Sequence, residues 1–201
     1  MPPEQRNAKL DARPGTALAR AMDEDIAEVL ISAEALKRRV KEIGAAIDRD
    51  FFGQEPVLVT ILQGALVFAA DLMRSIQQHL QLSSILVSSY PFGKQRAPEP
   101  QIVADLQIDI QGRHVILVED IVDSGNTLRV LLDRLQQRNP ASLSVATLLD
   151  KPSGRETSVP LRYIGFEVPA AFVVGYGLDY SGRYRNLPYI GALRGERIHE
   201  R

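Results

Sequence analysis

Val115-Ile-Leu-Val-Glu-Asp-Ile-Val-Asp-Ser-Gly-Asn-Thr-Leu128 is the segment that decides the fold, because it joins a strand pattern to a helix pattern through a short polar turn. Its first residues are apolar and mostly β-branched, as in a strand that is covered on both faces. Two carboxylates, Glu119 and Asp120, end this run, and a turn rich in small polar residues then opens a helix. The segment therefore predicts a strand, a loop and a helix in succession.

The turn after this strand has the composition of a phosphate-binding loop. Backbone N–H groups at a helix N-terminus, with a glycine that permits close approach and two hydroxyls, form a nest for a phosphate monoester. The residues that would form it are Ser124, Gly125, Asn126 and Thr127. Glu119 and Asp120 are suited to accept hydrogen bonds from sugar hydroxyls, so a sugar phosphate fits better than a bare phosphate. The alternative is that Asp123 and Ser124 merely cap a helix.

Two better-known nucleotide loops are excluded. The sequence contains neither the Gly-Lys-Ser/Thr ending of a nucleotide P-loop nor the Gly-x-Gly-x-x-Gly turn of dinucleotide-binding proteins.

Strand and helix patterns alternate along the chain on both sides of this segment. Helical spacing of apolar residues begins at Ser32, a good N-cap, and continues through Ile47. The other predicted elements are strands at Val57–Leu62, Ile85–Ser89, His114–Glu119 and Leu143–Leu149, and helices at Leu66–Leu80 and Thr127–Gln137. This alternation predicts an α/β fold, a parallel sheet flanked by helices on both faces, with ligand sites at the carboxyl ends of the strands. The loops after Leu62, Glu119 and Leu149 are therefore the expected site.

The remaining segments are less regular. Residues 1–23 are polar and weakly periodic, so we expect a mobile N-terminal arm, followed by a single domain over residues 24–201. The stretch Ser89–Gln101 is rich in Pro, Gly and charge, and is long enough to form a lid. After Pro160, short apolar runs predict a few irregular strands packed beside the main sheet, as a small hood.

Composition narrows the class of protein. The chain has 201 residues, of which 45% are hydrophobic, and a net charge of -1, which favours one domain without general attraction for nucleic acid or anionic membranes. It has no cysteine, which excludes disulfides and thiolate metal sites, and its three histidines do not cluster. No secretion signal opens the chain, and the apolar stretch Val57–Leu72 is interrupted by polar residues. We expect a cytoplasmic protein.

The segment around Asp123 resembles the phosphoribosyl pyrophosphate motif of the type I phosphoribosyltransferases. Further resemblances follow in the order of that family: Leu62-Gln-Gly64 resembles its pyrophosphate loop, and Val87-Ser-Ser-Tyr90 resembles the start of its flexible lid. Lys151-Pro and Phe172-Val-Val-Gly-Tyr-Gly-Leu-Asp179 resemble the purine-pocket segments of its hypoxanthine-guanine branch, and Tyr184-Arg-Asn-Leu-Pro188 resembles its C-terminal signature. The similarity extends from about Ile31 to Leu193.

The resemblance implies an enzyme of purine salvage, with displacement of pyrophosphate from phosphoribosyl pyrophosphate by hypoxanthine or guanine to give IMP or GMP. It also implies Mg2+ as cofactor and a homodimer or homotetramer. It assigns Asp123 as general acid or base, Glu119 and Asp120 to the ribose, Ser124, Gly125, Asn126 and Thr127 to the 5-phosphate, Gln63, Gly64, Ser89, Tyr90 and Arg185 to the pyrophosphate side, Lys151, Phe172, Val173 and Asp179 to the purine, and Glu119, Asp120 and Asp179 to the metal.

Chemistry supports the choice of base. The ammonium of Lys151 only donates, so it can pair with a 6-oxo group but opposes the 6-amino group of adenine with another donor. Hypoxanthine and guanine should therefore be accepted.

Two departures from the family pattern stand out. Gln63 occupies a position where the family commonly has Lys, which removes a cation from the leaving-group side unless Lys94 or Arg96 compensates. The lid continues as Pro91-Phe-Gly-Lys-Gln-Arg instead of a Thr/Ser-rich stretch. The family often holds the peptide before Gln63 in the cis form, which makes Leu62-Gln63 a candidate.

Three other functions remain open from the sequence. The chain could be an RNA-binding regulator of the same fold that retains the phosphoribosyl pyrophosphate loop. It could be a xanthine-preferring phosphoribosyltransferase. It could also be an inactive relative that binds nucleotides only.

Overall fold

The computed structural model describes residues 24–88 and 100–198. The expected arm, residues 1–23, and most of the expected lid, including Ser89 and Tyr90, lie outside this range. No helix in the described part of the chain is long and apolar enough to cross a membrane.

The main sheet has six strands in the order β4-β3-β2-β5-β6-β7. The strands β3, β2, β5, β6 and β7 are parallel to one another, and only the edge strand β4 is antiparallel. Their bounds are Val57–Leu62 for β2, Gln81–Ser88 for β3, Gln101–Ala104 for β4, His114–Val122 for β5, Ser142–Asp150 for β6 and Tyr163–Glu167 for β7. The α/β fold predicted from the sequence is confirmed.

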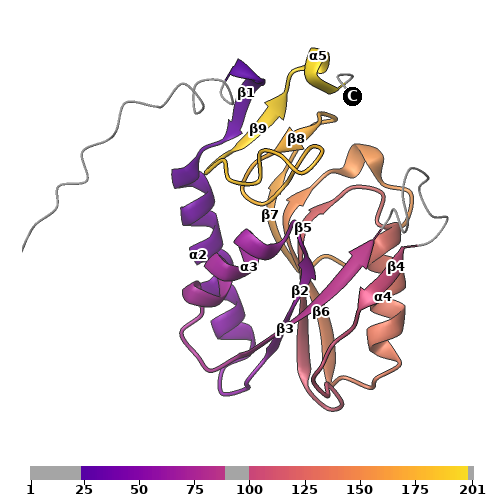
Figure 1. The fold of residues 1–201 in the computed structure, drawn as a ribbon. Coiled ribbons are helices and arrows are strands. Elements are labelled where there is room, and N and C mark those ends of the chain that lie inside the picture. The colour runs from indigo at the N-terminus through magenta and orange to yellow at the C-terminus, as the bar shows by residue number, and fades with distance from the viewer. Residues whose placement is uncertain (1–23, 89–99, 199–201) are drawn as a thin grey trace, which may run out of the picture.

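Helices cover both faces of this sheet (Figure 1). Helices α2 (Ala33–Asp50) and α3 (Leu66–Ser75) lie on one face, and α4 (Asn126–Gln136) lies on the other. Successive side chains of β5 alternate between the two faces, as the period of a strand requires. Ile116 and Val118 join the apolar cluster under α2 and α3, whereas Val115 and Leu117 join the cluster under α4.

A second, smaller sheet sits above the carboxyl ends of the main strands (Figure 1). It is antiparallel and joins β1 (Ile26–Ile31), β9 (Ile190–Leu193) and β8 (Val173–Val174) in the order β1-β9-β8. A short helix, α5, follows at Gly195–Ile198, and a 3-10 turn, η1, spans Pro152–Gly154. The chain thus has the predicted hood over the site end of the sheet.

The predicted helix Leu66–Leu80 was too long, because α3 ends at Ser75. Ile76 has an extended backbone, and the N–H groups of Gln77 and Gln78 donate to the Asp48 carboxylate instead of continuing the helix. The chain therefore turns early, and β3 begins at Gln81 rather than at the predicted Ile85.

Two strand predictions also need correction. Strand β5 does not end at Glu119 but continues to Val122, because its last residues still pair with β6. The run Tyr163–Phe166 was expected beside the main sheet, yet it forms β7 within that sheet, parallel to β6.

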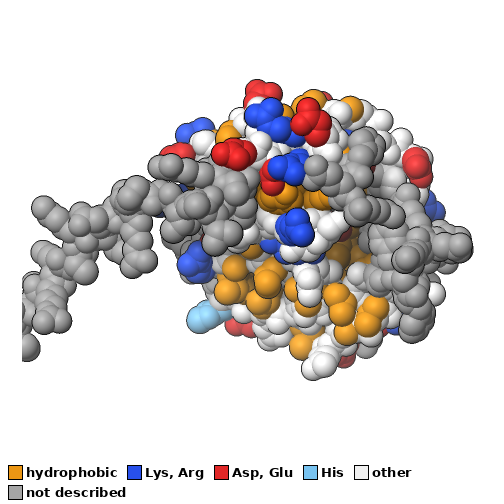
Figure 2. Space-filling view, turned by 45° about the horizontal axis from the view of Figure 1, so that its top comes forward, with side chains coloured by type: hydrophobic (Ala, Val, Ile, Leu, Met, Phe, Trp, Pro, Cys, Tyr) orange, Lys and Arg blue, Asp and Glu red, His pale blue; other side chains and the backbone are white. Residues whose placement is uncertain are grey.

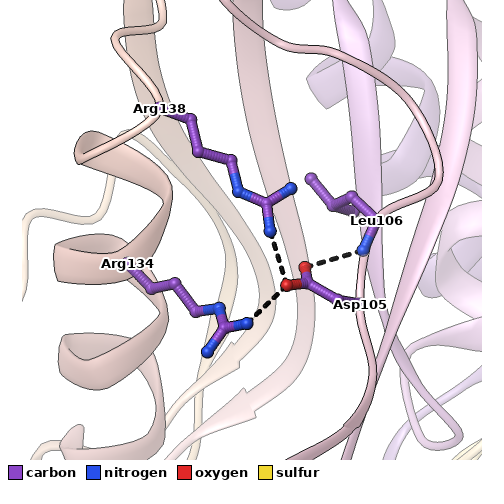
Figure 3. A network of polar contacts seen from close by, with 4 residues as sticks. All are labelled: Asp105, Leu106, Arg134 and Arg138. Carbon is purple, nitrogen blue, oxygen red and sulfur yellow. Dashed lines mark hydrogen bonds and ion pairs between the residues drawn. The ribbon is translucent and has the colours of Figure 1, made fainter.

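Asp105 fastens the edge of the sheet to α4 (Figure 3). It directly follows β4, and its Oδ2 accepts hydrogen bonds from Arg134 at 2.6 Å and Arg138 at 2.5 Å. Its Oδ1 accepts from the backbone N–H of Leu106. Burial alone would raise the pKa of Asp105, but these hydrogen bonds and the two guanidinium charges together lower it.

Candidate active site

The carboxyl ends of the central strands open into a cavity where the sequence predicted a site. Its walls come from β2, β5, the loop after β2 and the first turn of α4. The predicted site residues that line it are Gly64, Glu119, Asp120, Asp123, Ser124, Gly125 and Thr127. The expected phosphate nest, sugar-binding acids and pyrophosphate loop thus meet in one hollow.

A second cavity adjoins the first on the side of the hood. Its walls include the predicted purine-side residues Lys151, Phe172, Val173 and Asp179. Asp120 and Asp123 line both cavities, so they stand at the junction between them. The residues expected to bind a base and those expected to bind a sugar phosphate are therefore contiguous.

The phosphate loop is shaped by Gly125, whose φ of 84° lies in the left-handed region that favours glycine. A Cβ at this position would lie 2.5 Å from the carbonyl oxygen of Thr157, so a larger residue would also displace the neighbouring chain. Helix α4 then begins at Asn126, whose N–H donates to the Ser124 hydroxyl at 3.4 Å. Gly125 itself is the N-cap residue, and no side chain among the described residues caps α4, so neither Asp123 nor Ser124 has the capping role that the sequence left open.

Asp123 has a different environment from a helix cap. Its Oδ2 lies 3.2 Å from Nζ of Lys151, and its Oδ1 is seated so close to Gly154 that a Cβ there would overlap it. In the described part of the chain, its carboxylate is thus held by the connection after β6 rather than by the N–H groups of α4. About half of the Asp123 side chain, 49%, remains exposed to the cavities.

Glu119 and Asp120 differ sharply in burial. Glu119 is 8% exposed, and its carboxylate accepts a hydrogen bond from the Asp120 backbone N–H at 3.2 Å. Burial, and then the negative charge of Asp120, raise the pKa of Glu119 well above its usual value. This carboxyl can therefore hold a proton at a pH where an exposed glutamate has lost it.

The Asp120 carboxylate lies directly over the loop after β2. A Cβ at Gly64 would overlap Oδ2 of Asp120, so only glycine fits below this side chain. The peptide between Leu62 and Gln63 is cis, as the resemblance suggested, while the Gln63 side chain is exposed. The turn thus brings backbone, and no cationic side chain of its own, to the expected pyrophosphate side.

Arg185 does not line the cavity that contains Gly64 and Asp120. It lies along a third cavity, between α2, α3 and the segment 176–188. Its guanidinium donates to the Gly177 carbonyl at 2.6 Å and pairs with Oδ1 of Asp179 at 2.7 Å, while Oδ2 of Asp179 accepts from the Gly182 N–H at 2.7 Å. Both carboxylate oxygens of Asp179 are thus engaged.

On the base side, Phe172 is 41% exposed, and its ring meets that of Tyr180 edge to face at 5.2 Å between centroids. Val173, in β8, is buried. Lys151 follows β6 directly, with its side chain 19% exposed, so its apolar stem is covered while its ammonium reaches Asp123.

Sequence reasoning overlooked Arg155. This residue lies four positions after Lys151, and its guanidinium donates to the backbone carbonyls of Val122 and Asp123, directly before the phosphate nest. Nothing in its local pattern separates it from a surface arginine, because the contact joins segments 32 and 33 residues apart.

The part of the chain that the structure describes contains no group of three or more His, Cys, Asp or Glu side chains that could hold a metal ion by themselves. Glu119 and Asp120 are adjacent in the sequence, and both line the first cavity. Mg2+ is commonly held by one or two carboxylates together with substrate oxygens and waters, and this pair is compatible with that mode.

Comparisons with known proteins agree with this geometry. The profile of the phosphoribosyl transferase domain family matches residues 28–181. The hypoxanthine-guanine phosphoribosyltransferase of Bacillus subtilis is 46% identical over 86% of this chain and 96% of its own length. A hypoxanthine phosphoribosyltransferase crystal structure from Staphylococcus aureus superposes with a TM-score of 0.85 and 42% identity over 90% of this chain and 98% of the other.

A structure named hypoxanthine-guanine-xanthine phosphoribosyltransferase has a TM-score of 0.78 and 38% identity, over 85% of this chain and 99% of that one. The cavity at the strand ends, the glycine-dependent turn and these similarities over most of the chain lead to one assignment. The chain belongs to the phosphoribosyl transferase domain family and has the type I phosphoribosyltransferase fold.

Proposed function

We propose that the chain is a hypoxanthine-guanine phosphoribosyltransferase of purine salvage, which converts phosphoribosyl pyrophosphate and a 6-oxopurine into IMP or GMP and pyrophosphate. The observation that carries this proposal is the shared wall of the two cavities. Asp120 and Asp123 border both the side with the phosphate nest and the side with Lys151 and Phe172. A ribose held at this junction is within reach of a base in the second cavity.

The reaction forms a bond between a purine ring nitrogen and C1 of the ribose, while the bond from C1 to the pyrophosphate oxygen breaks. The ring nitrogen must lose its proton, and Asp123 is the acceptor that we assign. Its carboxylate borders both cavities, pairs with Lys151 and packs against Gly154, which supports this role. The proton and the leaving group thus depart on opposite sides of the sugar.

The 5-phosphate would bind to the backbone N–H groups of the Ser124–Thr127 nest at the start of α4. Asp120 and Glu119 would accept hydrogen bonds from the ribose hydroxyls. Pyrophosphate oxygens would bind to backbone N–H groups of the cis turn at Gly64. Arg185 would reach them only after leaving Asp179, and the lid residues Ser89 and Tyr90 are proposed to help.

Base selection rests on Lys151 and Phe172. The Lys151 ammonium donates to a 6-oxo group, and the exposed face of Phe172 is available to stack on the purine. Backbone carbonyls near Val173 and Asp179 would accept from the ring N–H and the guanine amine. Adenine, which offers a donor at the 6-position, would be a much poorer substrate.

Mg2+ is the cofactor that we propose, with Glu119 and Asp120 as the carboxylates that would hold it. The ligand atoms support the choice of Mg2+, because the oxygens of two adjacent carboxylates are the hard ligands that Mg2+ prefers. When bound, Mg2+ supplies Lewis-acid stabilisation of the negative charge on the departing pyrophosphate. Asp179 would join this set only by giving up a contact with Arg185 or Gly182.

We also propose that the protein works in the cytoplasm as a homodimer or homotetramer, without nucleic-acid or membrane partners. Its net charge of -1 gives no general attraction for polyanions. Large apolar side chains remain exposed on α3, β3 and β4, namely Leu66, Leu82 and Val103, and burial between copies would remove them from water. Hydrophobic side chains gather on the lower part of the face in Figure 2, below interspersed charges.

An assay across hypoxanthine, guanine, xanthine and adenine, with phosphoribosyl pyrophosphate and Mg2+, tests the proposal. We expect IMP and GMP to form and AMP to form much more slowly. If no 6-oxopurine reacts, the assignment is wrong. Faster use of xanthine would favour the xanthine-preferring alternative, and salt-dependent RNA binding without nucleotide synthesis would favour the regulator.

A further inference from the structure

The guanidinium of Arg155 donates hydrogen bonds to two backbone carbonyls directly before the phosphate nest. Its Nε donates to the Asp123 carbonyl at 2.9 Å, and its Nη2 donates to the Val122 carbonyl at 3.0 Å. The same Nη2 pairs with the carboxylate of Asp150, the last residue of β6. Because a guanidinium is planar with donors in a fixed fork, these three acceptors fix its position. The Val122 carbonyl also accepts from the Lys151 N–H at 3.0 Å, so Arg155 mainly determines the orientation of the Asp123 carbonyl.

The two residues after Arg155 donate to the next carbonyl along the chain, on the same side as Arg155. The N–H groups of Glu156 and Thr157 both donate to the Ser124 carbonyl, at 3.0 Å and 2.9 Å. Their side chains also meet Asn126, which donates to Glu156 at 2.6 Å and accepts from the Thr157 hydroxyl at 2.6 Å. The segment 155–157 therefore binds three successive carbonyls, those of residues 122 to 124.

This arrangement decides where the N–H groups of the loop point. In a trans peptide, the C=O of one residue and the N–H of the next point in opposite directions. The carbonyls of Val122, Asp123 and Ser124 face the segment 155–157, and the peptides that follow them are trans. Hence the N–H groups of Asp123, Ser124 and Gly125 face away from it, on the side where these residues line the cavity.

We propose that Arg155 is a positioning residue that, together with the backbone of Glu156 and Thr157, aims the N–H groups of the nest at the 5′-phosphate monoester of the substrate and product. The inference rests on the proposed function. It adds a residue that determines phosphate recognition although it lies outside the ligand-binding motif. Arg155 acts through the loop, not as a phosphate ligand, since its charge is paired with Asp150 and both side chains are largely buried, at 20% and 17% exposed. Its removal should weaken phosphate recognition while leaving recognition of the base unchanged.

The test compares two ligands that differ only in the 5′-phosphate, IMP and inosine. Their dissociation constants are measured by titration calorimetry for the wild type, Arg155→Ala and Arg155→Lys, together with the melting temperature of each protein. The ratio of the inosine constant to the IMP constant isolates the contribution of the phosphate. We expect this ratio to fall about tenfold in Arg155→Ala and less in Arg155→Lys, whose single ammonium cannot fork between the acceptors.

Arg162→Ala is the matched control. Arg162 also pairs with a carboxylate, Asp50 at 2.8 Å, and packs over the Phe51 ring, but it precedes β7 at the opposite end of the sheet from the site. This variant should lower the melting temperature without changing the ligand ratio. If Arg155→Ala does not fold, the Arg155→Lys ratio carries the test.

The outcomes separate the two proposals. A wild type that binds IMP no better than inosine would overturn the proposed function, and this inference with it. A wild type that favours IMP, with an unchanged ratio in the Arg155 variants, would overturn the inference alone, even if those variants melt at lower temperature.

Discussion

Nζ of Lys151 lies 3.2 Å from Oδ2 of Asp123, so the side chain assigned to read the purine 6-position and the one assigned to take its ring proton form a single ion pair. The pair joins the connection after β6 to the loop after β5 and stands at the border of the two cavities. Each partner therefore orients the other, and a substitution of one side chain affects both base selection and proton transfer. Experiments must therefore separate the effect on turnover from the effect on the preference between bases.

Asp123→Asn should mainly lower turnover. An amide keeps the size of the side chain and its oxygen acceptor, but it cannot take a proton from the purine ring. We expect kcat to fall about 100-fold or more, with the KM for phosphoribosyl pyrophosphate changed less than about threefold. Steady-state kinetics with hypoxanthine measure both. Asp133→Asn on the exposed face of α4 is the control, and a raised KM with normal kcat would refute the role assigned to Asp123.

Lys151→Ala should relax discrimination at the purine 6-position. Loss of the ammonium removes the donor that favours hypoxanthine and opposes adenine, so the ratio of kcat/KM for hypoxanthine over adenine should fall about tenfold. The ratio is the proper readout because the variant also frees Asp123 and lowers absolute rates. Lys41→Ala, on α2, should leave the ratio unchanged. If Lys151→Ala keeps the wild-type preference, Lys151 does not contact the base.

Elements could be predicted from the sequence where the local pattern of apolar and capping residues is enough to define their bounds. Strand β2 has the bounds Val57–Leu62 that its apolar run predicted, and α2 begins after the N-cap Ser32, since burial and capping leave a local signature. Strand β1 has no such pattern, because most of its side chains are not buried, and it exists through pairing of Ile26 with Leu193 at the far end of the chain.

The site was predictable only in part for the same reason. The residues of the nest are adjacent in the sequence, so their role follows from their order. Lys151, Phe172 and Asp179 were assigned through resemblance alone, because the fold brings them to Asp123 from distant segments. The burial of Glu119 and the contact of Arg155 with Asp123 depend on side-chain packing between elements, for which a single sequence has no periodicity to read.

Gln63→Lys should strengthen binding at the pyrophosphate end. Gln63 is exposed on the cis turn beside the cavity, so a lysine can be placed there without disturbing the core. An added cation near the leaving group should lower the KM for phosphoribosyl pyrophosphate about threefold at low salt, and the gain should shrink at 1 M salt through screening. Gln63→Ala is the neutral control. Equal KM values for both variants and the wild type would show that this side chain does not reach the pyrophosphate.

Asp105→Asn should lower stability in a manner that depends on pH. The lowered pKa of Asp105 means that its carboxylate stabilises the fold above the unfolded value of about 3.9, and that this contribution is lost as the pH falls through the folded pKa. At pH 7 we expect the variant to lose about 1 kcal/mol in the free energy of unfolding, because two guanidinium groups lose their charged acceptor. The difference should persist down to about pH 5 and shrink below about pH 4. Denaturant unfolding across this range measures the difference in the free energy of unfolding.

The control is Asp133→Asn, which breaks only the pair of an exposed carboxylate with Arg129 and should be nearly neutral throughout. A constant difference between wild type and Asp105→Asn from pH 7 to pH 3 would mean that the charge of Asp105 is not what fastens β4 to α4.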